Sequence, residues 1–444
     1  MYLASVISGG YRVVVQPYGA LWRTMHKIIH SALNINAAKT YIPYQNFESE
    51  QMLYDLLEQP DEYKNHLRRY TYSVTSQVTF GYRAPSITDE NLQQLFYCFQ
   101  FFSDAMASTI AGLLNLYPIL RSLPDFLLPI RRKTREFHKV ELALYMKHWV
   151  TARNQIKSGT ALPSFSYNLL KAQEEEKFSD EIACYISGTV LEAGSDTAAS
   201  TLIGFVQAMV LFPEAQKKAQ EEIDRVCGDR LPTMDDEFDM QYIRGCVKES
   251  LRWMPTLILG VPHAVIRDDE YLGYKIPKDA EVILNTWTIH CDANRYPNPR
   301  VFDPSRHADD LQTAAEAAAN PDASKRDHFG FGGGRRLCPG LHVAERMLFL
   351  GIARMLWGFD IAPAVDGATG EPILPDPLKL VLGGIVHPAP FPAKITPRSE
   401  ARARSIRDRW AADRARLDAE GQWREVPEGM KFHAYAPDKD KEKE

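Results

Sequence analysis

A single cysteine in a glycine-rich turn is the residue of this sequence best suited to bind a metal. Cys338 follows the run Phe331-Gly332-Gly333-Gly334-Arg335-Arg336-Leu337 and precedes Pro339-Gly340. A thiolate beside fixed cations and exposed backbone N–H groups is stabilised, which lowers the pKa of the thiol and favours metal ligation. A helical apolar pattern follows over residues 341–357. The cysteine therefore stands just before a helix N-terminus, where the pKa of a thiol also falls.

Three simpler interpretations of the turn compete with a metal site built on one cysteine. A G-x-G-x-x-G dinucleotide loop fails, because Arg335 stands where the third glycine belongs after Gly330 and Gly332. A zinc site fails, because no second cysteine or histidine stands at ligand spacing. An ordinary turn with an inert cysteine explains Cys338 alone, but not the arginines and glycines around it.

A second group of polar residues interrupts the longest helical pattern in the chain, residues 178–211. Gly194, Ser195, Asp196 and Thr197 lie at its middle, and glycine lowers helix stability. Such a patch is either a satisfied internal hydrogen-bond network or a functional kink. A carboxylate and a hydroxyl on adjacent residues can pass protons through ordered water.

A third feature is the pair Glu249 and Arg252, three residues apart on a predicted helix. On a surface such a pair contributes little to stability. However, Pro255 ends the helix, and Arg306 adds a second arginine in the proline-rich turn that follows.

Together these groups resemble motifs of the cytochrome P-450 family. Five residues match the haem-binding signature F-x-x-G-x-R-x-C-x-G, namely Phe331, Gly334, Arg336, Cys338 and Gly340. Residues 193–198 resemble the oxygen-activation motif [AG]-G-x-[DE]-T-[TS], with Ala198 in place of the last hydroxyl residue. The resemblance runs from about Trp22 to about Pro397, and residues 326–340 look most like filamentous-fungal members of secondary metabolism.

The resemblance implies heme b as cofactor, with Cys338 as the axial ligand of the iron. Trp22 and His26 correspond to the family's W-x-x-x-R, whose two side chains bind a haem propionate. Histidine replaces the arginine here, so its charge is not guaranteed. His263 is expected to touch a propionate from the segment after Pro255.

The resemblance also implies catalytic and structural roles. Gly194 would open its helix for dioxygen, while Asp196 and Thr197 would relay protons. Glu249, Arg252 and Arg306 would form a buried network that braces the cysteine loop. The residues expected to line a substrate pocket are Ala193, Leu257, Val261 and Ile385.

The implied activity is that of a haem-thiolate monooxygenase, which inserts one oxygen atom from dioxygen into a hydrophobic small molecule. Electrons would come from NADPH through NADPH-cytochrome P-450 reductase, and Arg335 is a candidate contact for that partner. Two alternatives stay open: a reductase-independent isomerase or peroxygenase of the same family, and a truncated or inactive haem-binding remnant. Isomerases usually lack the aspartate–threonine pair, which counts against them.

The fold predicted from the resemblance is mainly α-helical with a smaller β region. Residues 1–397 would form one haem domain, and residues 398–444 a charged, partly disordered tail. Strands are expected over 271–276 and 281–285. The family's N-terminal anchor and leading sheet strands are expected before residue 1 and are absent from this chain, so the sheet would have an exposed edge.

Composition narrows the function and the compartment. The 444 residues are 45% hydrophobic, which is ample for a large core. The formal net charge of −5 is spread along the chain and excludes a nucleic-acid footprint. Six scattered cysteines indicate a reduced, cytosol-facing protein. Family members lie on the cytosolic face of the endoplasmic reticulum membrane, and the apolar connector 116–129 is either core or a peripheral membrane contact.

Overall fold

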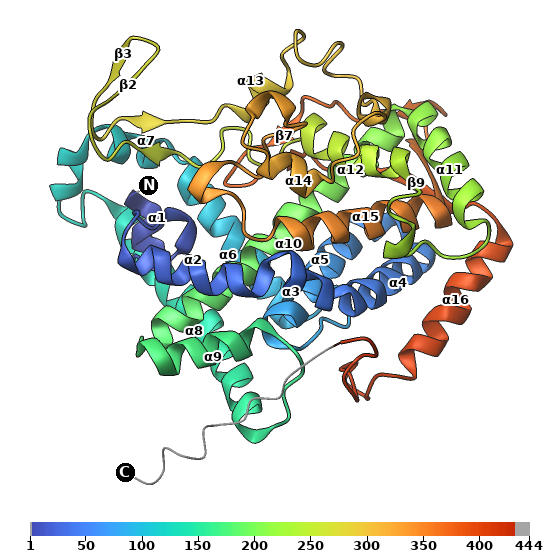
Figure 1. Ribbon diagram of the computed structural model, residues 1–444, viewed down its shortest axis with the longest axis horizontal. Coiled ribbons are helices and arrows are strands. Elements are labelled where there is room, and N and C mark those ends of the chain that lie inside the picture. Colours follow the sequence, from blue (N-terminus) through green and yellow to red (C-terminus); the bar gives the residue numbers. More distant parts are fainter. Residues whose placement is uncertain (1, 431–444) are drawn as a thin grey trace.

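The structure, a computed structural model, describes residues 2–430 of the chain (Figure 1). Helices make up most of it, as predicted, and the strands are short. The helices are α1 (Tyr2–Ile7), α2 (Ala20–Leu33), α3 (Ile35–Thr40), α4 (Ile42–Glu58), α5 (Tyr63–Phe80), α6 (Glu90–Ala107), α7 (Thr109–Leu116), α8 (Pro129–Ser158), α9 (Phe165–Glu176), α10 (Asp180–Leu211), α11 (Pro213–Cys227), α12 (Gln241–Trp253), α13 (Thr286–His290), α14 (Ala314–Ala319), α15 (Leu341–Gly358) and α16 (Glu400–Arg414). Short 3₁₀ turns include η1 (Val13–Val15), η5 (Pro304–His307) and η7 (Gly334–Arg336).

Helix α10 is the central element and packs mainly against α5 and α8. Nearly every side of it is buried, so it carries little of the polar face that a surface helix shows. Two glycines permit close helix contacts. A Cβ at Gly188 would lie 2.4 Å from the ring of Tyr145 in α8, and one at Gly194 would lie 2.8 Å from Thr75 in α5. Thr71 Oγ1 also donates to the carbonyl of Ser195, 2.6 Å away.

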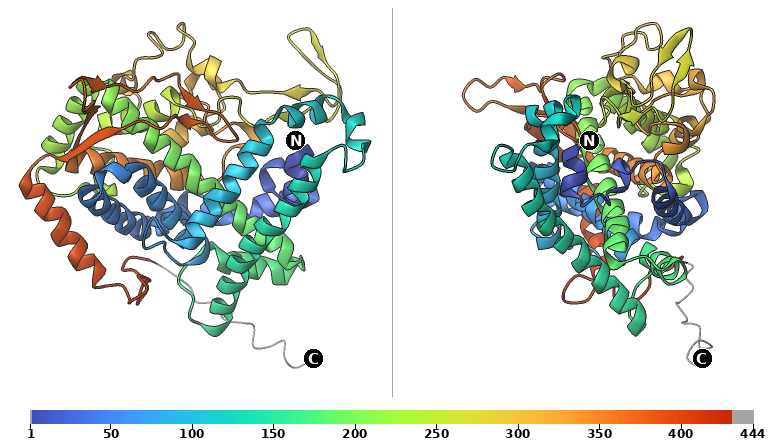
Figure 2. Two further views of the ribbon diagram at one scale, coloured as in Figure 1. Left: turned by 180° about the vertical axis from the view of Figure 1, so that it is seen from behind. Right: turned by 90° about the vertical axis from the view of Figure 1, so that its left-hand side faces the viewer.

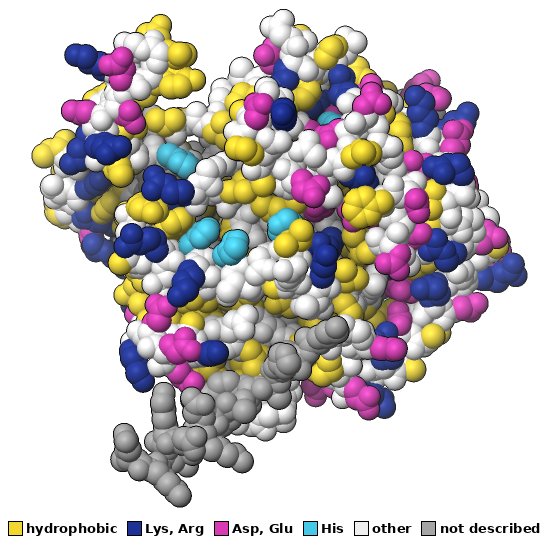
Figure 3. Space-filling model, in the orientation of Figure 1, with side chains coloured by type: hydrophobic (Ala, Val, Ile, Leu, Met, Phe, Trp, Pro, Cys, Tyr) yellow, Lys and Arg dark blue, Asp and Glu magenta, His cyan; other side chains and the backbone are white. Residues whose placement is uncertain are grey.

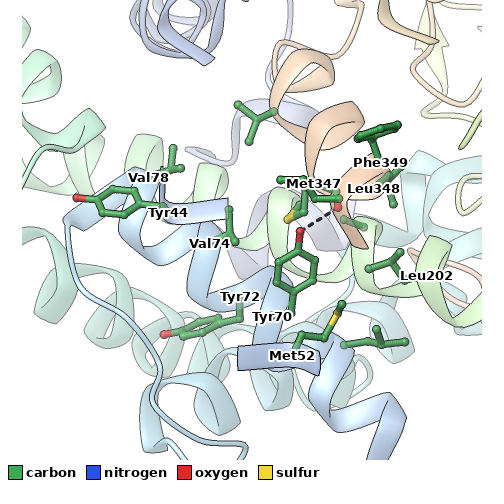
Figure 4. Packing of buried hydrophobic residues seen from close by; sticks show 14 of the residues in the cluster. Tyr44, Met52, Tyr70, Tyr72, Val74, Val78, Leu202, Met347, Leu348 and Phe349 are labelled. Atoms are coloured by element: carbon green, nitrogen blue, oxygen red, sulfur yellow. Dashed lines mark hydrogen bonds between the residues drawn. The ribbon is translucent and has the colours of Figure 1, made fainter. Parts of the chain in front are cut away.

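Helix α15, which begins just after the cysteine loop, enters the same core. Figure 4 shows Tyr70 of α5 directed at α15, where its hydroxyl donates to the carbonyl of Met347 at 2.9 Å. Leu202 of α10 and Phe349 of α15 lie in the same cluster of buried residues. The core thus joins α5, α10 and α15, the helices nearest the predicted chemistry.

The strands form four small antiparallel sheets within the described residues. They are β1 (His263–Ala264) with β4 (Glu281–Val282), β2 (Asp269–Tyr271) with β3 (Tyr274–Ile276), β6 (Pro372–Ile373) with β5 (Phe359–Val365) and β9 (Ala393–Pro397), and β7 (Leu380–Val381) with β8 (His387–Pro388). In the largest sheet Ile361 pairs with Ile395.

The strand predicted over 271–276 is wrong in detail, because the chain turns back within it. Leu272 and Gly273 have φ values of 51° and 82°, so they form the turn of a hairpin between β2 and β3. Glycine favours such a turn, since it adopts positive φ without a steric penalty. The hairpin projects from the body of the molecule (Figures 1 and 2). The strand predicted over 281–285 is shortened to Glu281–Val282.

The segment after residue 398 differs from the expected solvated tail. Helix α16 runs along α4 at the edge of the molecule (Figure 2) and buries Ala403, Ile406 and Trp410. Beyond it, Trp423 lies with its ring 4.3 Å from the ring of Phe47 in α4. The difference arises because a few apolar residues lie along one face of the helix and bury their surface against α4. The overall composition of the segment is dominated by charged residues and does not reveal this face. The rest of the predicted tail, 431–444, lies outside the described residues.

Candidate active site

The cysteine loop is a compact turn closed by backbone hydrogen bonds. Cys338 N donates to the carbonyl of Phe331 at 3.0 Å, and Gly332 N donates to the carbonyl of Phe329 at 3.0 Å. Gly332 and Gly334 have φ values of 71° and 61°, which L side chains rarely adopt. The glycines therefore allow the chain to double back and present the half-buried Cys338 just before α15.

The lowered pKa predicted for the Cys338 thiol is wrong for the protein alone. Burial raises the pKa, and the N–H of Gly340 offsets this only in part. The two arginines point elsewhere: Arg335 lies 4.7 Å over the ring of Tyr18, and Arg336 donates to the carbonyl of Gln16 at 2.7 Å. The free thiol is therefore protonated near neutral pH, and it would have to lose its proton to act as a metal ligand.

The predicted carboxylate-binding group is assembled between α2 and the cysteine loop. The rings of Trp22 and His26 stack with centroids 4.7 Å apart, and the Arg336 guanidinium lies 4.1 Å over Trp22. Partial burial lowers the pKa of His26, and the nearby His30 and Arg336 lower it further. His26 is consequently neutral near pH 7, so Arg336 carries the positive charge of this group.

His263 does not join that group. It lies in β1, paired with Val282, and its side chain is exposed. Within residues 2–430 it makes no hydrogen bond or ring contact with Trp22 or Arg336, and its predicted role stays a prediction.

The two predicted relay residues, Asp196 and Thr197, lie on different sides of α10. Ala193 is the one exposed residue of α10, all of which is described, and Thr197 lies one turn further on the same side. The Thr197 hydroxyl donates to the carbonyl of Ala193 at 2.6 Å. Asp196 is 4% exposed and leaves the helix about 100° around the axis from Thr197.

Asp196 borders a cavity of about 50 Å³ between α5, α6 and the β7–β8 turn. Burial raises the pKa of this carboxyl, while Arg68 and His387 lower it in part. Asp196 Oδ1 lies 4.0 Å from Arg68 Nε, and within the described part of the chain neither atom has a hydrogen-bond partner. The cavity is lined by Arg68, Phe96, Phe99, Gln100, Ser103, Asp196, Val381, Ile385 and His387.

The structure offers a second reason for a glycine at position 194, besides the predicted role with dioxygen. Helix α10 runs without a break through this residue, from Asp180 to Leu211. The glycine instead makes room for Thr75 of α5, as described above. Its action on dioxygen stays a prediction.

Glu249, Arg252 and Arg306 lie together, as predicted, and His307 joins them. Arg252 donates to both oxygens of Glu249, at 2.7 and 2.8 Å. Arg306 Nε lies 3.4 Å from Glu249 Oε1, and His307 Nε2 lies 3.2 Å from Oε2. The backbone N–H of Asp303 also donates to Glu249 at 3.0 Å. Burial alone would raise the pKa of Glu249, but Arg252 and His307 hold it at about 2.

The predicted substrate residues are partly brought together. Ile385 lines the cavity beside Asp196, while Ala193 is exposed on the neighbouring side of α10. Leu257 and Val261 are half-buried in the segment after α12, outside that cavity. The two segments touch, since Val386 N donates to the carbonyl of Thr256 at 2.8 Å.

Sequence reasoning missed Arg68, His387 and His307. His307 could have been found, because it directly follows Arg306 in the same turn. Arg68 and His387 carry no local signal, since they reach Asp196 only through the packing of α5 and β8 against α10.

The residues present fit a haem. A single thiol before a helix suits an axial iron ligand. Arg336 donates from Nη2 to the carbonyl of Gln16, which leaves other N–H groups of its guanidinium for a propionate. Ala193 is exposed in a helix whose other residues are buried or half-buried, and it provides a small side chain beside which a flat group can lie.

Comparison with known proteins agrees with this fit. The family model described as Cytochrome P450 matches residues 2–383. The cytochrome P450 monooxygenase virE of Hypocrea virens is 53% identical over 97% of this chain and 78% of its own length. The monooxygenase fogE of Aspergillus ruber is 46% identical over 97% and 79%.

A solved structure shows the same fold. A zebra fish cytochrome P450, in a structure with progesterone, superposes with a TM-score of 0.71 at 20% identity, covering 90% of this chain and 87% of that one. At such low identity the likeness concerns the fold alone.

Proposed function

This chain belongs to the cytochrome P450 family and is a monooxygenase of fungal secondary metabolism, and on that premise we propose what it oxidises and with which residues. Its substrate is a hydrophobic small molecule, into which one atom of dioxygen is inserted. The electrons come from NADPH through NADPH–cytochrome P450 reductase. The observation that carries the proposal is Cys338, presented before α15 by a loop that Arg336 ties to Trp22.

Residues of the loop and of α2 would hold the cofactor. Cys338 would ligate the iron, and Arg336, with Trp22 and His26, would bind a propionate. When bound, a thiolate-ligated haem supplies the cleavage of dioxygen and the oxidation of the substrate. The raised pKa of the free thiol is compatible with this assignment, because a bound metal would favour the thiolate over the thiol.

Asp196 and Thr197 would supply protons from two sides of α10. The raised pKa of Asp196 keeps a proton available on its carboxyl group at a higher pH than for an exposed aspartate. The cavity beside it has room for water and contains unpaired polar atoms of Asp196 and Arg68. The Thr197 hydroxyl donates to the carbonyl of Ala193, which fixes its direction. Its oxygen would then orient the last proton donor of the relay, on the exposed side of the helix.

The surroundings favour an apolar substrate. Phe96, Phe99 and Ile385 supply apolar surface next to Asp196. Ala193, Leu257 and Val261 add small or aliphatic side chains on neighbouring segments. Such a lining excludes water and binds hydrophobic molecules with few directed polar contacts.

The reductase would meet the face that carries the cysteine loop. Arg23 and Arg335 both lie over the ring of Tyr18, and exposed Lys27 follows on α2. Figure 3 shows this face, on which lysine and arginine side chains surround several histidines. Such a cationic surface suits an acidic partner.

The protein would lie at the cytosolic face of the endoplasmic reticulum membrane, with the connector 116–129 in contact with lipid. Leu116, Ile119 and Phe126 are 74%, 77% and 81% exposed there. Among the described residues, no single helix is long and apolar enough to cross a bilayer, while α10 and α11 pass that test only as a pair bent by 107°.

A carbon monoxide difference spectrum of the reduced protein tests the proposal. The wild type should show the red-shifted Soret band of a thiolate-ligated haem, and Cys338→Ser should not. With a reductase and NADPH, a screen of apolar compounds by spectral shift should identify ligands whose addition raises NADPH consumption and forms product. Wild-type protein that binds haem without the red-shifted band would contradict the assignment of Cys338.

A further inference from the structure

A buried histidine connects the Glu249 network to the cysteine loop. His290 ends α13 and is 1% exposed. Its Nδ1 lies 2.9 Å from the carbonyl of Arg252, and the backbone N of Phe329 lies 2.9 Å from its Nε2. The ring therefore sits between the end of α12 and the start of the loop that carries Cys338.

These two contacts fix the protonation state of the ring. The Arg252 carbonyl can only accept, so Nδ1 of His290 carries the hydrogen. The Phe329 N–H can only donate, so Nε2 must be unprotonated. A doubly protonated ring would place two N–H groups against each other. Burial, together with His328, Arg252 and Arg295, lowers the pKa of His290 to about 3, which is consistent with one neutral tautomer.

Arg252 and His290 are joined twice. Besides the ring contact, Arg252 Nη1 donates to the backbone carbonyl of His290 at 2.9 Å. Because the same guanidinium donates to Glu249, an uninterrupted chain runs from Glu249 through Arg252 and His290 to the Phe329 N–H. The carbonyl of Phe329 accepts from Gly332, and the carbonyl of Phe331 accepts from Cys338 itself.

Other contacts at the loop's start act on different groups. Lys248 pairs with Asp327 at 3.1 Å, and Tyr296 donates to the carbonyl of Asp327 at 2.8 Å. Arg295 lies 5.1 Å over the ring of Phe329. These contacts act on Asp327 and on the ring of Phe329, whereas within residues 2–430 the backbone N–H of Phe329 is accepted by His290.

We propose that His290, as this neutral tautomer, is a positioning residue for the cysteine loop: by accepting the Phe329 N–H it fixes the loop on the Glu249–Arg252 pair and so holds Cys338 in place. The inference rests on the proposed function only in taking Cys338 as the iron ligand. Losing the acceptor leaves a buried N–H unpaired and frees the loop from α12.

Two substitutions separate the ring's two contacts. The side chain of His290→Gln can place an acceptor near the position of Nε2, whereas that of His290→Asn reaches only the position of Nδ1. His148→Asn is the matched control. His148 is also buried and neutral, with its pKa lowered to about 4, but it lies in α8 beside Tyr82.

The first measurement is hydrogen exchange over residues 327–333 in the purified full-length proteins, which needs no assignment of the iron ligand. His290→Asn should exchange roughly ten-fold faster than wild type in this segment, as expected for one lost buried hydrogen bond. His290→Gln should resemble wild type, and so should His148→Asn. Equal exchange in wild type and His290→Asn, or equal acceleration in His290→Asn and His290→Gln, overturns the inference.

The second measurement is the rate at which the red-shifted carbon monoxide band converts to the unshifted form. It should rise roughly ten-fold in His290→Asn and stay near the wild-type rate in His290→Gln and His148→Asn. Conversion that follows only the melting temperature of each variant overturns the positioning role. A wild type without the red-shifted band contradicts the proposed function instead, and the exchange measurement still decides the role of His290.

Discussion

Asp196 Oδ1 and Arg68 Nε lie 4.0 Å apart, and both atoms lack a hydrogen-bond partner within the described residues. The separation is too long for a direct hydrogen bond and suits a bridging water in the cavity that both residues line. The carboxyl that is proposed to supply protons is therefore coupled to a partly exposed cation on α5, and not to Thr197, its neighbour in sequence.

We expect Arg68→Leu to make stability more dependent on pH. Burial raises the pKa of Asp196 in the folded protein, so the folded state binds this proton more tightly than the unfolded state. Stability then falls as pH rises from about 3.9, the ordinary value of aspartate, through the folded pKa. Removing Arg68 raises the folded pKa and extends the fall to higher pH.

Melting temperatures between about pH 4.5 and pH 7.5 measure this effect. Arg68→Leu should lose more stability near the upper limit than near the lower, relative to wild type. Arg68→Lys, which keeps the charge, should follow the wild-type profile. A constant difference between Arg68→Leu and wild type across the range would refute the coupling.

Thr197→Ala should divert electrons from product to hydrogen peroxide. Without the hydroxyl, the proton donor on the exposed side of α10 is no longer oriented. Consumption of NADPH then continues while the amount of product falls. Thr201→Ala is the control, because Thr201 makes the same type of bond one turn later, to the carbonyl of Thr197 at 3.0 Å, and is buried. If both variants couple NADPH consumption to product as wild type does, the role of Thr197 is wrong.

The motifs and most helices could be predicted because they depend on local spacing. The helical pattern after Cys338, the Glu249–Arg252 pair and the long central helix all follow from residues near one another in sequence. The directions in which side chains point could not be predicted from the sequence. Arg335 and Arg336 stand three and two residues before Cys338, yet they turn toward α2 and its preceding segment, so they do not stabilise its thiolate.

The C-terminal segment shows a signal that composition hid. Ala403, Ile406 and Trp410 are spaced three and four residues apart, which is the pattern of one buried helical face. The arginine content of the segment suggested a solvated tail instead. The partner of this face, α4, is distant in sequence, so local reasoning could not have supplied it.

Trp423→Ala should destabilise the fold by about 3–5 kcal/mol, the usual cost of deleting a buried tryptophan. The side chain is 7% exposed, packs on Phe47 and donates from Nε1 to Gln77 Oε1 at 2.6 Å. Denaturant unfolding monitored by circular dichroism gives the difference. Exposed Val426→Ala serves as the control and should stay within about 0.5 kcal/mol of wild type. Equal stability of the two variants would mean that the segment does not fold onto α4.

Glu249→Ala should yield little haem-loaded protein and lower stability by about 3–5 kcal/mol, because Arg252 is left buried without its carboxylate. The pKa of Glu249 is held at about 2, below the ordinary value, so its contribution is present above about pH 4.5 and is lost as pH falls through about 2. Glu136→Ala removes an exposed pair with Arg132 and should cost less than about 1 kcal/mol. Haem content equal to wild type in Glu249→Ala would remove the structural role.

The apolar connector gives the last prediction, on binding to a membrane. Replacing Leu116, Ile119 and Phe126 together by serine removes three strongly exposed apolar side chains without disturbing the core. Binding to neutral phospholipid vesicles should fall by roughly ten-fold or more, since each side chain buries apolar area in the interface. Leu311→Ser, at a position 74% exposed outside the connector, should bind as wild type does. Cosedimentation measures the bound fraction, and equal binding of the triple variant and wild type would exclude the connector as the contact.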